Sequence, residues 1–296
     1  MLGLAQKHGY AVGHFNTTNL EETQAIISAA THLRAPIIIG TSTKAITYTG
    51  TGNLCLLIKN MAHAKIPIAL HLDHGPNLAW AQRCIKEGYT SVMIDTSSLD
   101  YAQNVATTQK VVAYAHKRKI SVEAEIGILK GVEDDISSKQ EYLTTPKEAT
   151  RFVADTRCDS LAIAIGTSHG AYKFSQKPKL DLQRLWEIRE EVSVPLVLHG
   201  ASSVYPELVT KINRYGGRIN NAQGVPDTIL RKAIKAGICK INTDTDLRLA
   251  FTLGIRRHLS QHPQVYDIRE TLEEARQELQ QMVERKIKLF ESDGKA

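Results

Sequence analysis

Three histidines in this chain each precede a glycine at the end of an apolar run. They are His74, His169 and His199, and the first of them belongs to the run Leu70-His-Leu-Asp-His-Gly75. A catalytic zinc site uses three protein ligands and keeps one position open, and neutral imidazole is a preferred ligand. Three such histidines can meet at one ion only if the strands that carry them share a barrel or a sheet. The spacing therefore predicts a zinc site together with the architecture that it requires.

Two carboxylates are candidates for proton transfer beside such an ion. Asp73 directly precedes His74, and because strand residues alternate in direction, we expect the two side chains to leave the strand end differently. Glu133 lies in an acidic loop, where carboxylates are mostly just solvated. A zinc ion with an open position can polarise a carbonyl or activate water. Glu123 and Glu125 could orient a metal-binding histidine or form a buried salt bridge.

Eight short apolar runs, rich in Val, Ile, Leu and Ala without strict alternation, are typical of parallel strands that are covered on both faces. These predicted strands are 10–16, 36–42, 66–75, 91–96, 120–127, 160–170, 194–202 and 237–245. Amphipathic segments with helix-capping signals accompany them, and several open with a proline in the first turn. The predicted helices are 20–33, 78–87, 100–118, 146–156, 180–191, 206–215, 226–236 and 246–259.

Eight strands and eight helices are the count of a (β/α)8 barrel. A doubly wound open sheet is the competing architecture, but it usually carries a glycine-rich phosphate turn after its first strand. Here that strand continues into Asn16-Thr-Thr-Asn19. We therefore predict an α/β fold, a (β/α)8 TIM barrel in which residues 1–296 form a single catalytic domain. The charged segment 268–291 is expected to be an extra C-terminal helix that packs on the barrel or on another subunit.

The ends of the predicted strands are mostly polar, and barrel enzymes place their chemistry at these ends. The polar end residues are Asn16, Ser42, Asp73, His74, Asp95, Glu123, Glu125, His169, His199, Asn242 and Asp244. The loops after the last four strands are rich in Gly and Ser, which leave backbone N–H groups free to hold phosphate oxygens. A sugar phosphate with a carbonyl group fits this combination with zinc.

Charge and composition narrow the classes of partner. The formal net charge is +6 and the pI is near 9.0, but acids and bases are interspersed, so small anions fit better than nucleic acid. The four cysteines form no C-x-x-C pair, as is typical of a reducing cytosol. The chain has no apolar run of 18 residues and no signal-peptide core near residue 1. We therefore expect a cytoplasmic protein that binds neither membranes nor nucleic acids.

Six motifs follow one another along almost the whole chain. They are Tyr10-Ala-Val-Gly-His-Phe-Asn16, Leu70-His-Leu-Asp-His-Gly75, Glu123-Ala-Glu-Ile-Gly127, Gly166-Thr-Ser-His-Gly-Ala-Tyr-Lys173, Leu198-His-Gly200 and Lys240-Ile-Asn-Thr-Asp-Thr-Asp246. This set resembles the class II (zinc-dependent) fructose-bisphosphate aldolases. The resemblance implies reversible cleavage of fructose 1,6-bisphosphate to dihydroxyacetone phosphate and glyceraldehyde 3-phosphate, a step of glycolysis and gluconeogenesis. It also implies one Zn²⁺ per subunit on His74, His169 and His199, with a monovalent cation nearby.

The resemblance also implies roles for other residues. Asp73 matches the residue that exchanges the proton of the C4 hydroxyl, and Glu133 matches by position the glutamate that handles the C3 proton of dihydroxyacetone phosphate. Substrate contacts are implied for Asn16, Ser42, Gly170, Lys173, Gly200, Ser202, Asn242, Asp244, Thr245, Arg248 and Arg269. The arginine matched by Arg269 typically comes from a neighbouring subunit, so a homodimer or homotetramer is expected.

The chain departs from the family pattern at a few positions. The common His-Gly-x-Ser-Gly run reads His199-Gly-Ala-Ser-Ser203, which replaces a flexible glycine with serine. His14 stands where the family usually has alanine, and the amino terminus is a few residues shorter than usual. None of these departures removes a proposed catalytic group.

Two other enzyme classes are alternatives. Tagatose 1,6-bisphosphate aldolases tend to lack the acidic residue matched by Asp244, the arginine matched by Arg248 and the insert 216–226, so the sequence favours fructose. Barrel metallohydrolases typically begin with His-x-His on the first strand, which here carries Phe15 and Asn16 instead.

Overall fold

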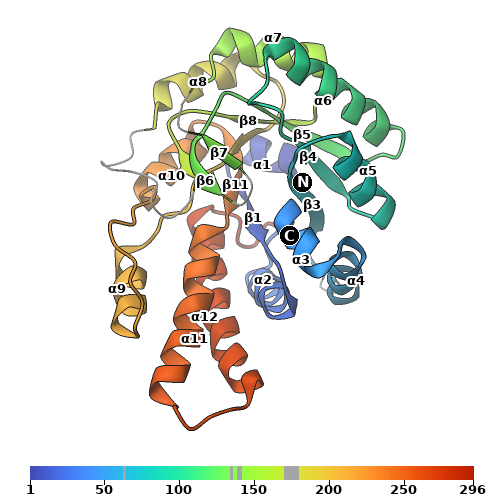
Figure 1. The fold of residues 1–296 in the computed structure, drawn as a ribbon. Helices are drawn as coiled ribbons and strands as arrows, with labels where there is room; N and C mark the ends of the chain where they lie inside the picture. The colour runs from blue at the N-terminus through green and yellow to red at the C-terminus, as the bar shows by residue number, and fades with distance from the viewer. Residues whose placement is uncertain (63–64, 134–135, 139–141, 170–179) are drawn as a thin grey trace.

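The computed structural model describes residues 1–62, 65–133, 136–138, 142–169 and 180–296. Eight parallel strands close into a barrel in the order β1-β11-β10-β8-β5-β4-β3-β2 (Figure 1). They are β1 (Val12–Asn16), β2 (Ile37–Ser42), β3 (Ile68–Gly75), β4 (Ser91–Ile94), β5 (Ser121–Ile126), β8 (Ser160–Ile163), β10 (Leu196–Leu198) and β11 (Ile238–Thr243). The predicted (β/α)8 TIM barrel is confirmed.

Helices alternate with the barrel strands along the chain. They are α1 (Leu2–His8), α2 (Leu20–His32), α3 (Thr43–Thr49), α4 (Thr51–Met61), α5 (Leu78–Glu87), α6 (Tyr101–His116), α7 (Pro146–Thr156), α8 (Leu182–Glu191), α9 (Pro206–Arg214), α10 (Asp227–Lys235), α11 (Thr245–Gln261) and α12 (Ile268–Leu289). The side chains of Asn19, Asn77 and Asp100 cap α2, α5 and α6 by accepting a backbone N–H three residues on. No helix in the described segments has the length and apolar character needed to span a bilayer.

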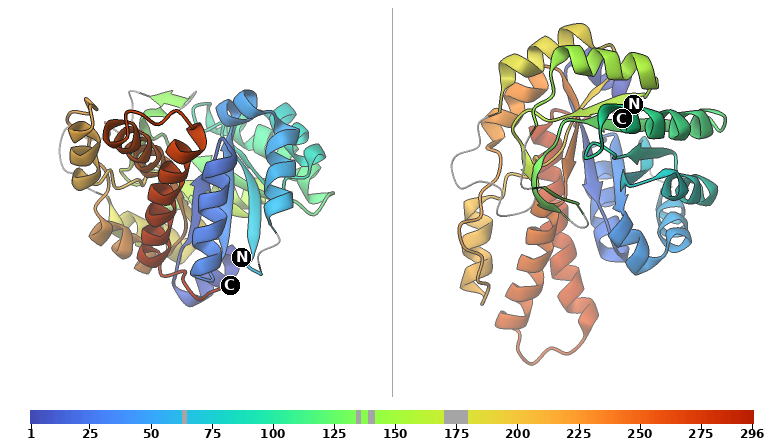
Figure 2. Two further views of the ribbon diagram at one scale, coloured as in Figure 1. Left: turned by 90° about the horizontal axis from the view of Figure 1, so that it is seen from below. Right: turned by 45° about the horizontal axis from the view of Figure 1, so that its top comes forward.

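The predicted helices are present, but their distribution along the chain was partly wrong. All eight predicted helices exist, but α9 and α10 both lie between β10 and β11, so together they serve one strand-to-strand connection. The connection after β2, for which no helix was predicted, contains α3 and α4. The predicted C-terminal helix is α12, which pairs with α11 in a hairpin that extends beyond the barrel and packs against α2 (Figure 1). The two termini lie close together in every view (Figure 2).

A small second sheet stands apart from the barrel and consists of β6 (Lys130–Glu133), β7 (Ile136–Ser138) and β9 (Ser168–His169). The predicted strand 160–170 is therefore too long, because β8 ends at Ile163 and β9 pairs with β6 instead. Gly166 separates them with a φ of +99°, a backbone conformation that glycine allows and that breaks a strand. The acidic loop predicted around Glu133 begins with a strand.

Candidate active site and metal centre

Charged and polar side chains meet inside the barrel. Lys240 on β11 donates a hydrogen bond to Glu123 on β5 at 2.8 Å, and Asn242 on β11 donates to Asp73 on β3 at 3.0 Å. Neither pair of strands is adjacent in the barrel, so both contacts cross its interior. All four side chains are buried, and each therefore depends on its protein partner rather than on bulk water.

His74 reaches this interior through a distortion of β3. The pairing of β3 with β4 shifts register between Leu72 and Gly75, and His74 has a φ of +48°, in the left-handed region. Its Nε2 atom lies 4.0 Å from Asp73 Oδ1, so the expectation that these two side chains diverge is wrong. The Nδ1 atom lies 2.7 Å from Asp95 Oδ2, and this contact orients the ring.

His199 follows β10 directly and is buried between two carboxylates of β5. Its Nε2 atom lies 3.0 Å from Glu123 Oε1, and its Nδ1 atom lies 2.9 Å from Glu125 Oε2. Burial opposes a charge on the ring, but Glu125 and Glu123 outweigh it and raise the pKa of His199. The ring centroids of His199 and His74 are 4.7 Å apart, so two of the three predicted metal ligands meet.

The third predicted ligand, His169, lies on β9, close to the loop that carries His199. Gly200 has a φ of +59°, and a Cβ at this position would lie 2.6 Å from the carbonyl oxygen of Ser168. Only glycine fits there, and it lets the two loops touch. β9 also pairs with β6, the strand that ends at Glu133. The side chains of His169 and Glu133 lie outside the described part of the structure.

Asp73 is the carboxylate at the centre of this group. Asn16 donates a hydrogen bond to Oδ2 at 2.9 Å, and Asn242 donates to Oδ1 at 3.0 Å, so the two oxygens have separate amide partners. Burial alone would raise the pKa of Asp73, but the electrostatic influence of its neighbours His74 and Lys240 holds that pKa well below its usual range. Asp73 is therefore an ionised carboxylate in a fixed orientation.

The donor set fits a divalent metal ion with histidine ligands. Asp73, His74 and His199 each offer one ligand atom, and these atoms lie within 4.8 Å of one another. Metal-binding histidines usually have their other ring nitrogen held by a carboxylate, as Asp95 holds Nδ1 of His74. Carboxylates contact both ring nitrogens of His199, so a bound ion would replace one of these two contacts. Burial disfavours the imidazolium form of His74, but Asp73, Asp95 and Glu125 raise its pKa to about 10. The carboxylates that stabilise this proton would equally attract a metal cation.

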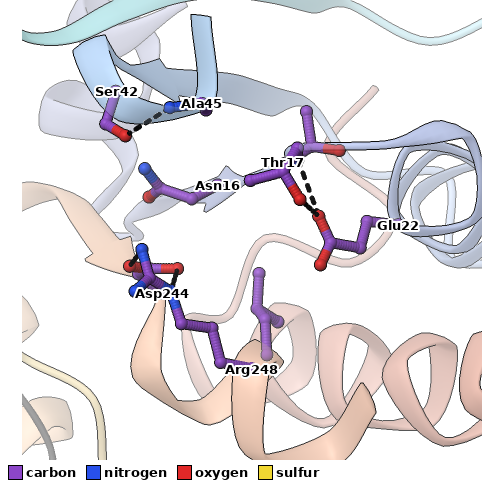
Figure 3. Close-up of a pocket in the computed structure, with 9 residues that line it drawn as sticks. Asn16, Thr17, Glu22, Ser42, Ala45, Asp244 and Arg248 are labelled. Carbon is purple, nitrogen blue, oxygen red and sulfur yellow. Dashed lines mark hydrogen bonds and ion pairs between the residues drawn. The ribbon is translucent and has the colours of Figure 1, made fainter. Parts of the chain in front are cut away.

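A cavity of about 180 Å³ adjoins the cluster through Asn16 (Figure 3). It is lined by Asn16, Thr17, Thr18, Glu22, Ser42, Ala45, Asp244, Leu247 and Arg248. Four predicted substrate contacts are among these residues. Arg248 binds Asp244 through two N–H groups, at 2.9 and 2.7 Å, which is the fork geometry that guanidinium groups favour. The cavity thus combines a fixed carboxylate, a positive charge and hydroxyl groups beside Asp73.

The remaining predicted contacts have different positions. Ser202 and Thr245 are buried after β10 and β11, which are neighbours in the barrel. Gly170 and Lys173 lie outside the described residues. Arg269 lies in the first turn of α12, at the far tip of the hairpin, where its exposed side chain pairs with Asp267 at 2.6 Å. Within one chain, Arg269 is therefore not part of the cluster.

Two interior residues were given no role from the sequence. Lys240 was noted only as part of a motif, although a lysine inside the apolar run Ile238–Ile241 signals a buried ion pair. His14 was left unassigned, although it lies two residues before Asn16 and so shares its face of β1.

Comparisons with known proteins extend over the whole chain. A family model described as fructose-bisphosphate aldolase class-II matches residues 1–295. The fructose-bisphosphate aldolase of Thermus caldophilus is 44% identical to this chain, over 100% of this chain and 98% of its own length. That of Helicobacter pylori (strain ATCC 700392 / 26695) is 42% identical, over 98% of this chain and 96% of its own length.

Two solved structures are also similar. The crystal structure of the YdjI aldolase from Escherichia coli K12 has a TM-score of 0.82 at 30% identity and covers 100% of this chain and 97% of that chain. The Campylobacter jejuni fructose-bisphosphate aldolase has a TM-score of 0.77 at 19% identity, over 100% of this chain and 94% of that one, and shares the fold. From the family model and the relatives together, this chain belongs to the metal-dependent class II fructose-bisphosphate aldolase family.

Proposed function

We propose that the chain is a fructose-bisphosphate aldolase that reversibly cleaves fructose 1,6-bisphosphate to dihydroxyacetone phosphate and glyceraldehyde 3-phosphate. The observation that carries this proposal is Asp73, an ionised, doubly hydrogen-bonded carboxylate next to the paired rings of His74 and His199. It lies at the barrel end where this class of fold places its chemistry. Residues 1–296 act as a single catalytic domain in this proposal.

His74, His169 and His199 would hold the metal, which we propose is one Zn²⁺ per subunit. When bound, the ion would polarise the ketone of the sugar and stabilise negative charge that develops there. Asp95 fixes the ring of His74, and Glu123 and Glu125 fix that of His199, so the chain presents its ligands in defined orientations.

Asp73 is the base in the cleavage direction. It takes the proton of the C4 hydroxyl while the C3–C4 bond breaks, so glyceraldehyde 3-phosphate leaves and the electron pair of the broken bond stays with C3. Asn16 and Asn242 keep the carboxylate oriented for this transfer. Glu133 then supplies a proton to C3, which completes dihydroxyacetone phosphate.

The two phosphates would occupy separate parts of the barrel mouth. The cavity beside Asn16 offers Ser42, Asp244 and Arg248. The end of β11 and the segments that follow β8, β10 and β11 offer the remaining contacts. The latter are Gly170, Lys173, Gly200, Ser202, Asn242 and Thr245. We further propose a cytoplasmic homodimer or homotetramer in which Arg269, at the exposed hairpin tip, approaches the site of a neighbouring subunit.

A coupled assay on the fructose and tagatose bisphosphates, with and without a chelator, tests the function. We expect cleavage of the fructose epimer, its loss after chelation and its recovery with Zn²⁺ or Co²⁺. Borohydride added with substrate should not inactivate the protein, because no lysine Schiff base takes part. Preferential cleavage of the tagatose epimer, or activity that survives chelation, would contradict the proposal.

A further inference from the structure

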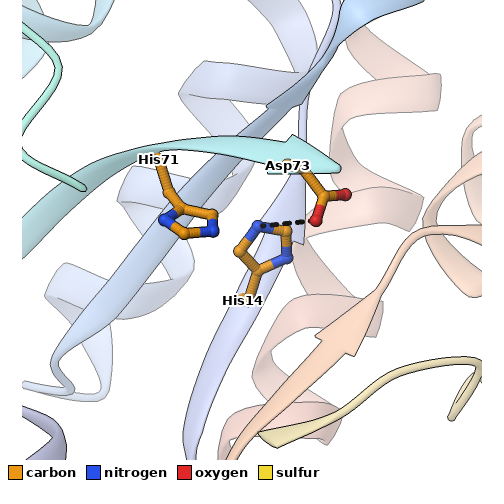
Figure 4. Close-up of side chains that lie close together, drawn as sticks. All are labelled: His14, His71 and Asp73. Atoms are coloured by element: carbon orange, nitrogen blue, oxygen red, sulfur yellow. Dashed lines mark ion pairs between the residues drawn. The ribbon is translucent and has the colours of Figure 1, made fainter. Parts of the chain in front are cut away.

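A second group of potential metal ligands lies inside the barrel and consists of His14 on β1 and His71 and Asp73 on β3 (Figure 4). One ligand atom from each residue lies within 4.8 Å of the others. His14 Nε2 is 3.8 Å from Asp73 Oδ1, and the two imidazole rings stand edge to face with centroids 5.4 Å apart. His14 and His71 have no part in the mechanism proposed above.

The sequence makes room for this group at one glycine. β2 lies between β1 and β3, and Gly40 on β2 is the register partner of His71. A Cβ at Gly40 would lie 2.0 Å from His14 Nε2, so a side chain there would displace the ring. Glycine at this position lets His14 reach across β2 toward His71 and Asp73.

The two rings offer nitrogen atoms that nothing else in the described structure uses. Both ring nitrogens of His14 and the Nε2 atom of His71 are buried and without a hydrogen-bond partner among the described residues. His14 is 0% and His71 1% exposed, so bulk water does not replace the missing partners. An unpartnered buried polar atom is costly, and three of them around one carboxylate indicate that a ligand belongs there.

The protonation and charge of the group suit a metal cation. Burial lowers the pKa of His14 well below its usual range and that of His71 to about 3, so both rings carry free lone pairs at neutral pH. Donation from Nδ1 of His71 to Ser91 Oγ, 2.8 Å away, would leave its Nε2 lone pair for the ion. The positive charge of nearby Lys240 is compensated by Glu123.

We propose that His14, His71 and Asp73 bind a second divalent transition-metal ion, such as Zn²⁺, inside the barrel. Two imidazoles and one carboxylate are a ligand set that such ions accept, with a further position for water. Asp73 also borders the His74–His199 site, so an ion on the inner site would occupy the carboxylate that acts as base. Excess metal would then inhibit the enzyme; this consequence alone rests on the proposed function.

Metal stoichiometry tests the inner site without reference to activity. The metal-free protein is dialysed against Zn²⁺ and the bound metal is measured by elemental analysis. We expect two ions per chain for the wild type, one for His14→Leu and one for the His74→Ala/His199→Ala double variant. Saturation of the wild type at one ion, or two ions in His14→Leu, would overturn the proposal.

Thermal unfolding provides a second measurement that controls for misfolding. In chelator, His14→Leu should melt no lower than the wild type, because leucine has a similar size and leaves no ring nitrogen unpaired. In the His74→Ala/His199→Ala background, added Zn²⁺ should raise Tm when His14 is present and leave it unchanged in His14→Leu. An equal rise in Tm with histidine and with leucine at position 14 would contradict the inner metal site.

Inhibition of cleavage by excess Zn²⁺ tests whether the inner site regulates the enzyme, separately from whether the site exists. Each protein is compared with its own activity at one equivalent of Zn²⁺. We expect cleavage by the wild type to fall at least tenfold as Zn²⁺ fills the second site, whereas His14→Leu keeps its starting rate. Equal inhibition of the wild type and His14→Leu would refute the regulatory role. Absence of all cleavage would refute the proposed function. In either case the metal stoichiometry would still decide whether the inner site exists.

Discussion

At the scale of single residues, Asp73 is distinguished by how completely its carboxylate is fixed. Two asparagines from different strands hold its two oxygens, and neighbouring cationic groups keep its pKa low. Replacing it removes a base and leaves the His74 and His199 rings in place. We expect Asp73→Ala to lower the cleavage rate on the order of 10²–10⁴-fold while the protein still binds its catalytic ion.

The measurement for Asp73→Ala pairs steady-state kinetics with the metal content at one equivalent of Zn²⁺. Asp293→Ala, at an exposed position near the C-terminus, is the matched control and should behave as the wild type. Loss of the catalytic ion in Asp73→Ala would mean that Asp73 holds the metal site together rather than moving a proton.

Asp244 is expected to decide between sugar epimers. Its carboxylate lines the cavity and is fixed there by two contacts with Arg248. A carboxylate that pairs with a substrate hydroxyl rejects the epimer that leaves it unpaired. We expect Asp244→Ala to lose most of the preference for fructose 1,6-bisphosphate over the tagatose epimer, measured as the ratio of the two kcat/KM values. An unchanged ratio would remove Asp244 from substrate selection.

At the scale of elements, the sequence predicted the barrel strands because buried parallel strands leave a plain apolar signature. It failed where local backbone geometry decides. β8 ends early, at Ile163, and Gly166 with its positive φ lies in the link to β9. The shifted register of β3 turns His74 toward Asp73. Apolar periodicity carries no information on either feature. The contact between Lys240 and Glu123 joins strands far apart in the chain, so only the closed barrel reveals it.

The C-terminal helix α12 is tied to the loop after β10 by a buried ion pair. Lys286 lies 2.7 Å from Asp246 and donates to the Ser203 hydroxyl at 2.8 Å, which gives this serine a structural partner. Asp246 also accepts the backbone N–H groups of Ser203 and Val204, and Val204 has a strained φ of +47°. Asp246 therefore links α12 to the loop that follows His199.

Breaking this pair should be costly. Lys286→Met leaves the buried charge of Asp246 without compensation, so we expect the free energy of unfolding to fall by about 3–5 kcal/mol. Denaturant titration measures the change. Lys288→Met, on the exposed side of the same helix, should change stability by less than about 0.5 kcal/mol. Similar losses in the two variants would show that Lys286 contributes through helix propensity rather than through the ion pair.

Acid should loosen the α11–α12 hairpin through Glu274. Burial opposes ionisation of Glu274, but hydrogen bonds from Arg257 and His258 outweigh it and lower its pKa. A lowered pKa stabilises the fold above the ordinary glutamate pKa of about 4.3, and this contribution is lost as pH falls through the lowered value. We expect Glu274→Gln to reduce the drop in Tm between pH 6 and pH 3. Glu270→Gln, at an exposed position on α12, should leave the full drop.

At the scale of the whole molecule, the barrel carries Asp73, whereas the α11–α12 hairpin carries Arg269 at its tip, away from the barrel interior. Arg269 lies at the exposed tip, 87% accessible, whereas Asp73 is deep in the barrel mouth. If neighbouring subunits exchange these tips, each complete site combines Asp73 of one chain with Arg269 of another. Arg269→Ala and Asp73→Ala would then be defective for different reasons.

Mixing these two variants tests the exchange. After unfolding and joint refolding at equal amounts, half of the dimers are mixed, and each mixed dimer contains one site with both residues intact. We therefore expect about one quarter of wild-type activity, well above either variant alone, measured in the coupled assay. The control is the wild type refolded with Asp73→Ala, which should give about half of the wild-type activity because every chain then has Arg269 and half of the chains have Asp73. If Arg269 acted within its own chain, the mixture would give only the average of its two components.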